Sequence, residues 1–387
     1  MSTVAAFSFP TSVRYGAGVL REIRNELEDL EIRRPLVVCD KFLPDTPAFG
    51  LLDDVLREIP NLEQPTLFRD VHPNPVEADV VGAAQAYREA QCDGIIGLGG
   101  GSALDVAKVC RLIIQCPDFQ LDDSDRLQRE KWDLLPPFIA IPTTAGTGSE
   151  VGRSSVVTLK STGAKSVIFH ANLLADLVIL DPKITVSLPP KLTAATGLDA
   201  LTHCIESFTS PVIQPLCDGI ALEGIQLIAK HIVTSVQDGT NLEARGGMQL
   251  AAMMGGIAFQ KDLGATHSMA HPLSSLCGLH HGLANALCLP AVMRWNADKK
   301  PGLYRRIGIS AGLNLFEASD QVADNATITW VNKLLSDSGI QMGLSNHGVT
   351  KDHIEPLSQL AIKDSCHLTN PVSMLQEDFL KLYQTAL

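Results

Sequence analysis

Histidine and aspartate residues with helical spacing are the part of this sequence best suited to chemistry. The stretch Gly264–Ala286 holds four of the chain's eleven histidines: His267, His271, His280 and His281. Upstream, Asp199 precedes His203 by four residues, a spacing that places both side chains on one face of a helix. A carboxylate and several imidazoles are donors that first-row divalent cations accept. We therefore predict a metal centre with four ligands: Asp199, His203, His267 and His281.

The predicted ligand set suits a catalytic cation. Such a cation keeps one coordination position open for substrate, and one carboxylate with three imidazoles suits either Fe²⁺ or Zn²⁺. A single histidine is more often a hydrogen-bonded core residue than a ligand, but the two pairs with the same helical spacing favour a site. His280 is the weakest member, because it adjoins His281 and would point elsewhere on a helix.

A glycine-rich loop could bind phosphate. Gly99, Gly100, Gly101 and Ser102 lie between a predicted strand and a predicted helix. Glycines let the backbone approach a phosphate, and the helix N-terminus offers N–H groups and a partial positive charge. Ser102 could cap the helix and donate to a phosphate oxygen. The spacing departs from the full dinucleotide fingerprint, and a tight turn without a ligand is the alternative, but three consecutive glycines favour a phosphate site.

A second loop and an acidic residue complete the predicted nucleotide site. The loop PTTAGTGSE, residues 142–150, follows another predicted strand and could wrap a diphosphate or ribose, although a polar turn is the alternative. Asp40 ends an earlier predicted strand, where a carboxylate can bind the ribose 2′-hydroxyl and would repel the 2′-phosphate of NADP. It therefore favours NAD, unless it is simply an exposed aspartate. Asp40 precedes Gly99 by 59 residues, whereas an ordinary Rossmann domain has the acid after its glycine loop, so we predict a variant fold.

Short apolar runs alternate with helical patterns in the first half of the chain. Helices are predicted at Leu51–Ile59, Glu77–Gln91 and Ala103–Ile114. Strands are predicted between them, at Pro35–Asp40, Gly94–Leu98, Pro137–Ile141 and Leu177–Leu180. This alternation implies βαβ units in a parallel sheet, whose ligands bind beyond the carboxyl ends of the strands.

The second half of the chain shows helical periodicity without strand-like runs. Helices are predicted at Asp218–Ile232, Leu242–Phe259, Gln321–Ser336, Ile354–Lys363 and Gln376–Ala386. Two consecutive prolines, at 189 and 190, accompany the change of pattern. We therefore predict a Rossmann-like α/β dinucleotide-binding domain at 1–185 and an all-helical, metal-binding catalytic domain at 186–387.

Composition narrows the class of partner. The 387 residues are 45% hydrophobic and 19% charged, as expected of a globular protein with a large core. A net charge of −12 without a basic run makes nucleic acid and anionic membranes poor partners, which leaves small molecules. Neither a secretion signal nor an apolar run long enough for a membrane span is evident. Nine cysteines without a Cys-x-x-Cys pair indicate reduced thiols in a cytoplasmic protein.

Over essentially its whole length the sequence resembles the iron-activated (group III) alcohol dehydrogenases. The motifs that carry the resemblance are FPTSVRYGAG, GGGSALDVAK, PTTAGTGSEV, DPKITVSLPPKLTAATGLDALTHCIESF, AHPLSSLCGLHHGLANALCLPAVMRWN and LKLYQTAL. The resemblance implies an NAD-binding α/β domain followed by a helical metal domain, an architecture shared with dehydroquinate synthase. It also implies Fe²⁺ as the metal and a homodimer or higher homo-oligomer.

The resemblance also implies roles for single residues. The family's metal ligands fall on the four residues named above, and His271 matches a nearby histidine of the active site that is not a ligand. We expect His271, or a chain of water and ribose hydroxyl groups, to carry a proton while hydride passes between an alcohol and NAD. Nucleotide contacts are implied at Asp40, Asn74, Gly100, Gly101, Ser102, Asp105, Thr143, Thr144, Thr147 and Lys165.

Two departures from the family pattern leave the substrate open. AHPLSS stands where AHPLGA or AHPLGG is usual, and GRSSVVT stands where TRFAVIT is common. Primary alcohols, diols and short hydroxy acids such as 4-hydroxybutyrate all remain candidates. Arg153 could bind an acidic substrate group, or could be a surface or helix-capping residue. Two other interpretations are a metal-dependent lyase or cyclase of the dehydroquinate synthase type, using NAD transiently, and a non-catalytic binding protein for NAD or metal.

Overall fold

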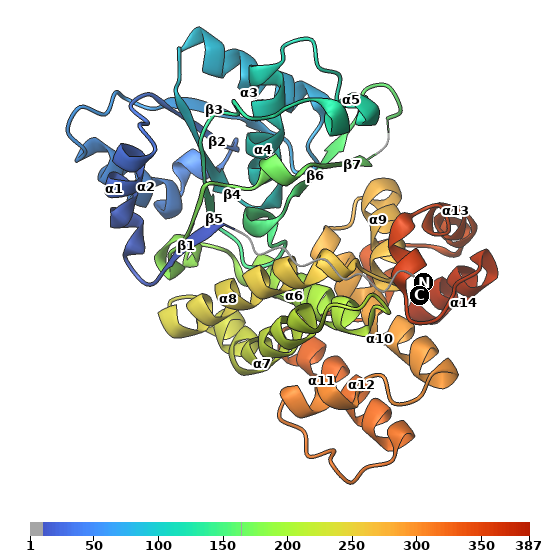
Figure 1. The fold of residues 1–387 in the computed structure, drawn as a ribbon. Coiled ribbons are helices and arrows are strands. Elements are labelled where there is room, and N and C mark those ends of the chain that lie inside the picture. Colours follow the sequence, from blue (N-terminus) through green and yellow to red (C-terminus); the bar gives the residue numbers. More distant parts are fainter. Residues whose placement is uncertain (1–10, 164) are drawn as a thin grey trace. The chain divides into compact units, whose positions relative to one another are not determined.

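The chain forms two compact units in the computed structural model, which describes residues 11–163 and 165–387 (Figure 1). The sheet unit comprises residues 11–144 and 148–188, and the helical unit comprises residues 145–147 and 189–387. The loop PTTAGTGSE is therefore divided, because its middle three residues belong to the helical unit.

A six-stranded parallel sheet organises the sheet unit. The strand order is β1-β8-β5-β4-β2-β3, and every pair of neighbours is parallel. The strands are β1 (Ser12–Tyr15), β2 (Pro35–Asp40), β3 (Thr66–Val71), β4 (Gly94–Gly99), β5 (Phe138–Pro142) and β8 (Leu177–Leu180). The predicted parallel α/β architecture is confirmed, with β2, β4, β5 and β8 at the predicted positions.

The strands that sequence reasoning missed lie where the sheet is exposed. Interior strands covered on both faces read as continuous apolar runs, and β4, β5 and β8 are buried along their whole length. The edge strands β1 and β3 are largely exposed or half-buried and carry charged residues, so neither forms a continuous apolar run in the sequence. The antiparallel hairpin of β6 (Ser154–Thr158) and β7 (Lys165–Phe169) was also missed, because its short strands alternate polar or half-buried residues with buried ones.

Five helices and several 3₁₀ turns connect the strands. The helices are α1 (Ile23–Asp29), α2 (Pro47–Arg57), α3 (Glu77–Glu89), α4 (Gly101–Gln115) and α5 (Ser124–Arg129). The turns are η1 (Val19–Glu22), η2 (Leu43–Asp45), η3 (Ser149–Val151), η4 (Ala171–Leu173) and η5 (Pro182–Thr185). Helix α2 begins four residues earlier than predicted, because the Thr46 hydroxyl accepts the N–H of Phe49 and Pro47 starts the first turn.

The helical unit contains helices and 3₁₀ turns but no strand among residues 189–387, all of which are described. Its helices are α6 (Pro190–Thr209), α7 (Pro215–Gln237), α8 (Leu242–Ala258), α9 (Ala265–Cys277), α10 (His281–Lys299), α11 (Arg305–Ser310), α12 (Asp320–Asp337), α13 (Lys351–Ala361) and α14 (Gln376–Ala386). The turns are η6 (Phe259–Lys261), η7 (Leu344–His347) and η8 (Ser365–Thr369). Within the described part of the chain, no helix has the length and apolar character needed to cross a bilayer.

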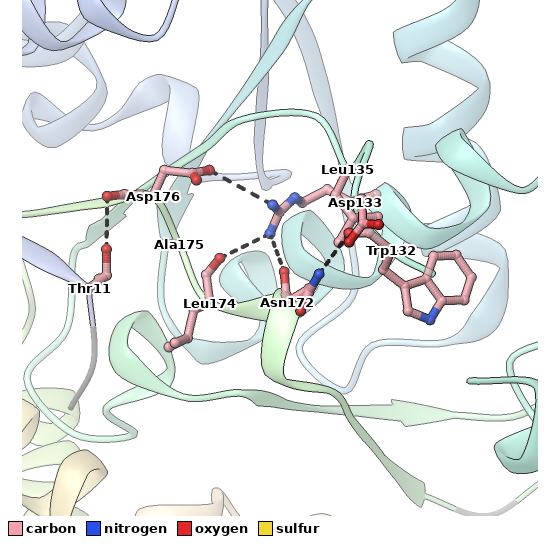
Figure 2. Close-up of a pocket in the computed structure, with 9 residues that line it drawn as sticks. Thr11, Trp132, Asp133, Leu135, Asn172, Leu174, Ala175 and Asp176 are labelled. Atoms are coloured by element: carbon pink, nitrogen blue, oxygen red, sulfur yellow. Dashed lines mark hydrogen bonds and ion pairs between the residues drawn. The ribbon is translucent and has the colours of Figure 1, made fainter. Parts of the chain in front are cut away.

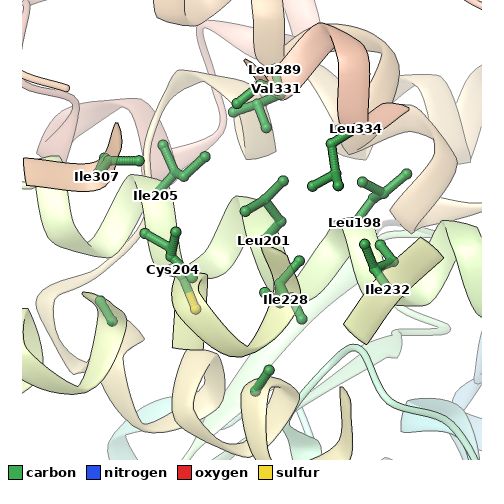
Figure 3. Close-up of a cluster of buried hydrophobic side chains, with 14 of the residues drawn as sticks. Leu198, Leu201, Cys204, Ile205, Ile228, Ile232, Leu289, Ile307, Val331 and Leu334 are labelled. Atoms are coloured by element: carbon green, nitrogen blue, oxygen red, sulfur yellow. The ribbon is translucent and has the colours of Figure 1, made fainter. Parts of the chain in front are cut away.

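Helix α6 lies in the middle of the helical unit. Fifteen of its 20 residues are buried, and it packs against α7, α8 and α10. Its apolar side chains Leu198, Leu201 and Ile205 meet side chains from α7, α10, α11 and α12 (Figure 3). A helix buried on all sides normally carries few ionisable groups. The buried Asp199, His203 and Glu206 of α6 therefore need partners or a ligand.

Candidate metal centre and nucleotide-binding loops

The glycine loop joins β4 to α4 at the carboxyl end of the strand. Gly99 has a φ of +151°, and a Cβ there would lie 2.7 Å from the Cβ of Ala103, so the position requires glycine. Gly100 is the N-cap of α4 and has no side chain to accept a hydrogen bond from the first turn. Among the described residues no side chain caps α4, so the N–H groups of its first turn could bind an anion.

The second loop meets the first at the same edge of the sheet. The N–H of Thr143 donates to the carbonyl of Gly99 at 2.9 Å, and a Cβ on Gly100 would lie 3.4 Å from Cγ2 of Thr144. Thr147 belongs instead to the helical unit. In that unit a Cβ on Gly146 would lie 2.7 Å from the Cβ of Thr196, so glycine is required for this close approach.

Three other predicted nucleotide residues lie in one loop cluster. Lys165 Nζ, at the start of β7, donates to Asn74 Oδ1 at 2.8 Å across 91 positions of sequence. The Ser102 hydroxyl donates to the carbonyl of Pro73 at 2.7 Å, so Ser102 does not cap α4 as the sequence suggested. The structure thus brings Asn74, Ser102 and Lys165 together beside the start of α4.

Asp40 stands at the carboxyl end of β2, which is the neighbour of β4 in the sheet. One of its carboxylate oxygens accepts the N–H groups of Phe42 at 2.9 Å and Leu43 at 3.1 Å. These bonds fix the orientation of the half-buried carboxylate at the strand end next to the glycine loop.

Asp105 is turned into the protein, although the resemblance implies a nucleotide contact there. Its Oδ1 accepts the hydroxyl of Ser149 at 2.6 Å and lies 3.3 Å from Lys108 Nζ, and its Oδ2 accepts the N–H of Val156 at 2.9 Å. The fully buried Lys108 also donates to the carbonyls of Ser149 and Ser154. The carboxylate therefore links α4 to η3 and β6 by hydrogen bonds.

A second buried carboxyl group, that of Glu150, lies close to this network. Burial raises the pKa of Glu150 to about 7, while a backbone hydrogen bond and the charge of Lys108 oppose the shift. Burial lowers the pKa of Lys108, and the carboxylate of Asp105 opposes that change. Glu150, the last residue of the second loop, is therefore a carboxyl group whose charge changes near neutral pH.

The four predicted metal ligands converge within the helical unit. One donor atom each of Asp199, His203 and His267 lies within 4.8 Å of the other two. The Nε2 atoms of His281 and His267 lie 3.6 Å and 4.0 Å from Asp199 Oδ1. The first three side chains are buried, whereas the His281 side chain is 30% exposed. The i, i+4 pair predicted on one helix lies on α6, and α9 and α10 supply the other two residues.

Asn285 lies one turn after His281 on α10, and its side-chain amide contacts three of these residues. Its Nδ2 lies 2.7 Å from Asp199 Oδ1, 3.1 Å from His267 Nε2 and 3.2 Å from His281 Nε2. An amide NH₂ has two hydrogens and cannot satisfy three acceptors. The fit to a metal comes from the donor set, since one carboxylate and three imidazoles with donor atoms this close together suit Fe²⁺ or Zn²⁺.

Glu206 lies behind His267 and fixes its ring. Oε2 of Glu206 is 2.6 Å from Nδ1 of His267 and accepts the N–H of Gly264 at 2.9 Å, while Oε1 accepts the N–H of Thr266 at 2.6 Å. Because a carboxylate only accepts, a neutral His267 ring carries its proton on Nδ1 and has a free lone pair on Nε2, which lies 4.0 Å from Asp199 Oδ1. Carboxylates commonly hold metal-binding histidines in this way.

The charges in the metal centre favour the forms that bind a cation. Burial alone would raise the pKa of Asp199, but the three surrounding histidines and Asn285 lower it to about 2. Burial lowers the pKa of His203 to about 4 and that of His281 well below its usual value. Burial also acts to lower the pKa of His267, but Glu206 outweighs it and raises that pKa. A proton therefore competes with a bound cation more strongly at His267 than at His203 or His281.

His271 lies one turn after His267 on α9 and is paired with a distant carboxylate. Its ring stacks on the ring of His281 with centroids 5.2 Å apart, and its Nδ1 is 2.7 Å from Asp364 Oδ2. Burial opposes ionisation of Asp364, but the bond from His271 holds the pKa of this carboxyl group well below its usual range. His280 is exposed at the N-cap of α10 and takes no part in the cluster.

Two arginine side chains, Arg153 and Arg111, lie outside these sites. The guanidinium of Arg153 lies over the ring of Phe169, 5.4 Å from its centroid, so it packs against the β6–β7 hairpin. Arg111 is 4% exposed and donates to the carbonyls of Pro136 and Leu174. It lines a cavity of about 540 Å³ (Figure 2). That cavity lies beside the N-terminal ends of β5 and β8, at the edge of the sheet away from the nucleotide loops.

Sequence reasoning missed three residues of the metal centre. Glu206 follows Asp199 by seven residues and His203 by three, so the helical stripe that revealed the first two also contained the third. Asn285 likewise follows His281 by four residues. Asp364 had no local signal, because its partner His271 is 93 residues away.

Comparison with known proteins places both halves of the chain in one family. Residues 10–182 match the model for "Iron-containing alcohol dehydrogenase", and residues 193–387 match "Fe-containing alcohol dehydrogenase family, C-terminal". The 4-hydroxybutyrate dehydrogenase of Cupriavidus necator is 35% identical over 401 aligned residues, which cover 99% of this chain and all of the relative. The choline dehydrogenase of Bacillus subtilis is 32% identical, covering 99% of this chain and 95% of that protein.

Solved structures agree with the sequence matches. A 1,3-propanediol oxidoreductase has a TM-score of 0.90 at 31% identity, covering 99% of this chain and all of that one. A sulfoacetaldehyde reductase from Bifidobacterium kashiwanohense, solved in complex with NAD⁺, has a TM-score of 0.87 at 30% identity, covering 100% and 99%. These matches support the alcohol dehydrogenase interpretation over the lyase and the binding protein. The chain therefore belongs to the iron-containing alcohol dehydrogenases, oxidoreductases that use NAD and Fe²⁺.

Proposed function

We propose that this enzyme interconverts a short alcohol and its aldehyde by hydride transfer with NAD, at a divalent metal held by Asp199, His203, His267 and His281. The proximity of these donors carries the proposal, because one donor atom each of buried Asp199, His203 and His267 lies within 4.8 Å of the other two, and His281 Nε2 lies 3.6 Å from Asp199 Oδ1. When bound, Fe²⁺, or Zn²⁺ in its place, supplies Lewis-acid polarisation of the substrate oxygen.

The residues around the metal have separate tasks. Asp199 brings one negative charge, and Glu206 accepts the Nδ1 proton of His267, so that in the neutral ring the lone pair is on Nε2. His271, close to His281 and 32% exposed, carries a proton between the substrate hydroxyl and solvent. A neutral imidazole accepts the hydroxyl proton while the hydride leaves the carbon for the nicotinamide. In the reverse direction it returns the proton.

The sheet unit, within the domain at 1–185, is proposed to bind NAD. The first N–H groups of α4, at Gly101 and Ser102, would bind the pyrophosphate, and Thr143 and Thr144 would contact it from the second loop. Asp40 would accept the ribose hydroxyls, which favours NAD over NADP. Asn74, Thr147 and Lys165 are proposed as further contacts, and Asp105 supports the loop from inside. The domain at 186–387 would hold the metal.

We propose a short substrate with a second polar group, such as 4-hydroxybutyrate or 1,3-propanediol. The named substrates of the relatives above share this feature, since carboxylate, hydroxyl, trimethylammonium and sulfonate groups all lie at the end away from the reacting carbon. Ser274 lies on the α9 face of His267 and His271, and its buried hydroxyl has no partner among the described residues. That hydroxyl could bind such a group. A simple primary alcohol lacks a second polar group.

A substrate comparison tests this proposal. The enzyme would be loaded anaerobically with Fe²⁺ or Zn²⁺, and NADH formation would be followed with 4-hydroxybutyrate, 1,3-propanediol and 1-butanol. We expect kcat/KM to be about 5–150-fold higher for the polar substrates, since leaving a buried hydroxyl without a partner costs about 1–3 kcal/mol. Ser274→Ala should reduce this preference, and exposed Ser275→Ala should not. Equal or greater activity with 1-butanol would contradict the substrate class.

The metal ligands can be tested without turnover. His267→Ala should lose most bound metal, measured by elemental analysis after gel filtration, while NADH binding measured by fluorescence stays close to normal. His280→Ala is the matched control, because this exposed histidine lies outside the cluster and should leave metal content unchanged. Retention of metal in His267→Ala, with loss of NADH binding, would refute the assignment.

We also propose that the enzyme works in the cytoplasm as a homodimer or higher homo-oligomer. All nine cysteines lie in described residues and none forms a disulfide, as expected of a reducing compartment. Light scattering coupled to gel filtration would test the assembly, and a monomeric mass at micromolar concentration would contradict it.

A further inference from the structure

The carboxylate of Asp364 holds His271 from behind. Asp364 follows α13 and caps η8, whereas His271 lies on α9. The two side chains meet at 2.7 Å between Oδ2 and Nδ1. The Asp364 side chain is only 20% exposed, so little water competes for this bond.

The other oxygen of Asp364 accepts two hydrogen bonds. Oδ1 accepts the hydroxyl of Ser268 at 2.8 Å and the N–H of Cys366 at 2.9 Å. The Ser268 oxygen in turn accepts the N–H of His367 at 2.8 Å. These bonds prevent the carboxylate from rotating, so Oδ2 faces His271. Because an ionised carboxylate only accepts, the proton of the shared hydrogen bond must lie on Nδ1 of His271.

We propose that Asp364 is a positioning residue that holds neutral His271 in its Nδ1–H tautomer and leaves Nε2 bare as the proton acceptor. This inference rests on the proposed function only for the role of Nε2, because the tautomer itself follows from the hydrogen bonds. Asp364 does for His271 what Glu206 does for His267, so α9 presents two histidines in the same tautomer, each held by a carboxylate from another segment.

The substitution Asp364→Asn makes a sharp test. The amide oxygen should stay with the N–H of Cys366, because turning the NH₂ toward it would oppose two donors. The NH₂ would then face His271 and donate to Nδ1, which forces the proton to Nε2. A comparable change in serine proteases leaves the geometry intact but puts the histidine in the wrong tautomer and greatly reduces turnover.

Nitrogen NMR of ¹⁵N-histidine protein loaded with Zn²⁺ would report the tautomer directly, with His271 assigned by its absence in His271→Gln. We expect the Nδ1–H form in the unsubstituted protein and the Nε2–H form in Asp364→Asn. Ser268→Ala is the matched control, since it removes one bond to Oδ1 but leaves the His271 bond, and should keep the Nδ1–H form. The kcat of Asp364→Asn should fall about 10–100-fold, as for other partners of active-site histidines, with KM and metal content little changed.

Several outcomes would overturn the inference. A neutral His271 protonated on Nε2 in the unsubstituted protein would do so, even if Asp364→Asn failed to fold. So would Asp364→Asn with the Nδ1–H form and unchanged kcat. Binding of a second Zn²⁺ per chain that is lost in Asp364→Asn would show that His271, Asp364 and Cys366 form a cation site instead. Absence of turnover with every alcohol, with the expected tautomers present, would count against the proposed function alone.

Discussion

Replacement of Glu206 by glutamine should weaken metal binding without removing a ligand. The carboxylate of Glu206 accepts three N–H groups, from Gly264, Thr266 and His267, and is 4% exposed. An amide of the same shape has one oxygen, so its NH₂ must face at least one of these donors. If the NH₂ faces Thr266, a buried N–H loses its acceptor. If it faces His267, the ring must move its proton to Nε2, where the metal would bind.

Each alternative has a cost that can be worked out. A buried donor without an acceptor costs about 1–3 kcal/mol of folding free energy. Loss of the partner that orients a metal-binding histidine reduces metal affinity about 10–100-fold, which is about 1.4–2.7 kcal/mol. We therefore expect Glu206→Gln to raise the Kd for Zn²⁺ by about 10–100-fold, or to lower stability by a similar free energy.

Competition with a fluorescent chelator would measure the Kd, and urea unfolding with and without Zn²⁺ would measure stability. Glu243→Gln is the control, since this carboxylate is 77% exposed and pairs with Lys230 at the surface. A Kd within twofold of the unsubstituted value, together with unchanged stability, would refute the assignment of Glu206 as the residue that orients His267.

Two further predictions concern stability. Because folding raises the pKa of Glu150 to about 7, the unfolded chain ionises first as pH rises. The free energy of unfolding should therefore fall between about pH 4.5 and 7, by up to about 3 kcal/mol, and Glu150→Gln should remove this fall in urea titrations at several pH values. A decline of the same size in that variant would contradict the assignment. Asp262, with φ 62° and ψ −176°, occupies a region that is nearly exclusive to glycine. Asp262→Gly should raise the free energy of unfolding by about 1 kcal/mol in urea, after the entropy cost of glycine, and a decrease would show that the backbone is not strained.

The sequence alone determined the features that depend only on residues close together in the chain. The candidate ligands Asp199 and His203 were visible because helical spacing places i and i+4 on one face, and the glycine loop was visible because Gly99 and Gly100 adjoin a buried strand. Interior strands were predicted because burial on both faces demands continuous apolar residues. These patterns need no knowledge of which segments meet.

Tertiary structure decided everything that depends on which segments meet. Glu206 reaches His267 across 61 residues and Asp364 reaches His271 across 93, and no local pattern specifies either pair. The same applies to Asp105, which sequence motifs place beside a nucleotide and which packing directs toward Ser149 and β6. Side-chain type and helical spacing therefore predicted which residues could bind a metal. The packing of α6, α9 and α10 determined which carboxylate fixes the tautomer of each histidine, because a hydrogen bond forms only where folding brings donor and acceptor within about 3 Å.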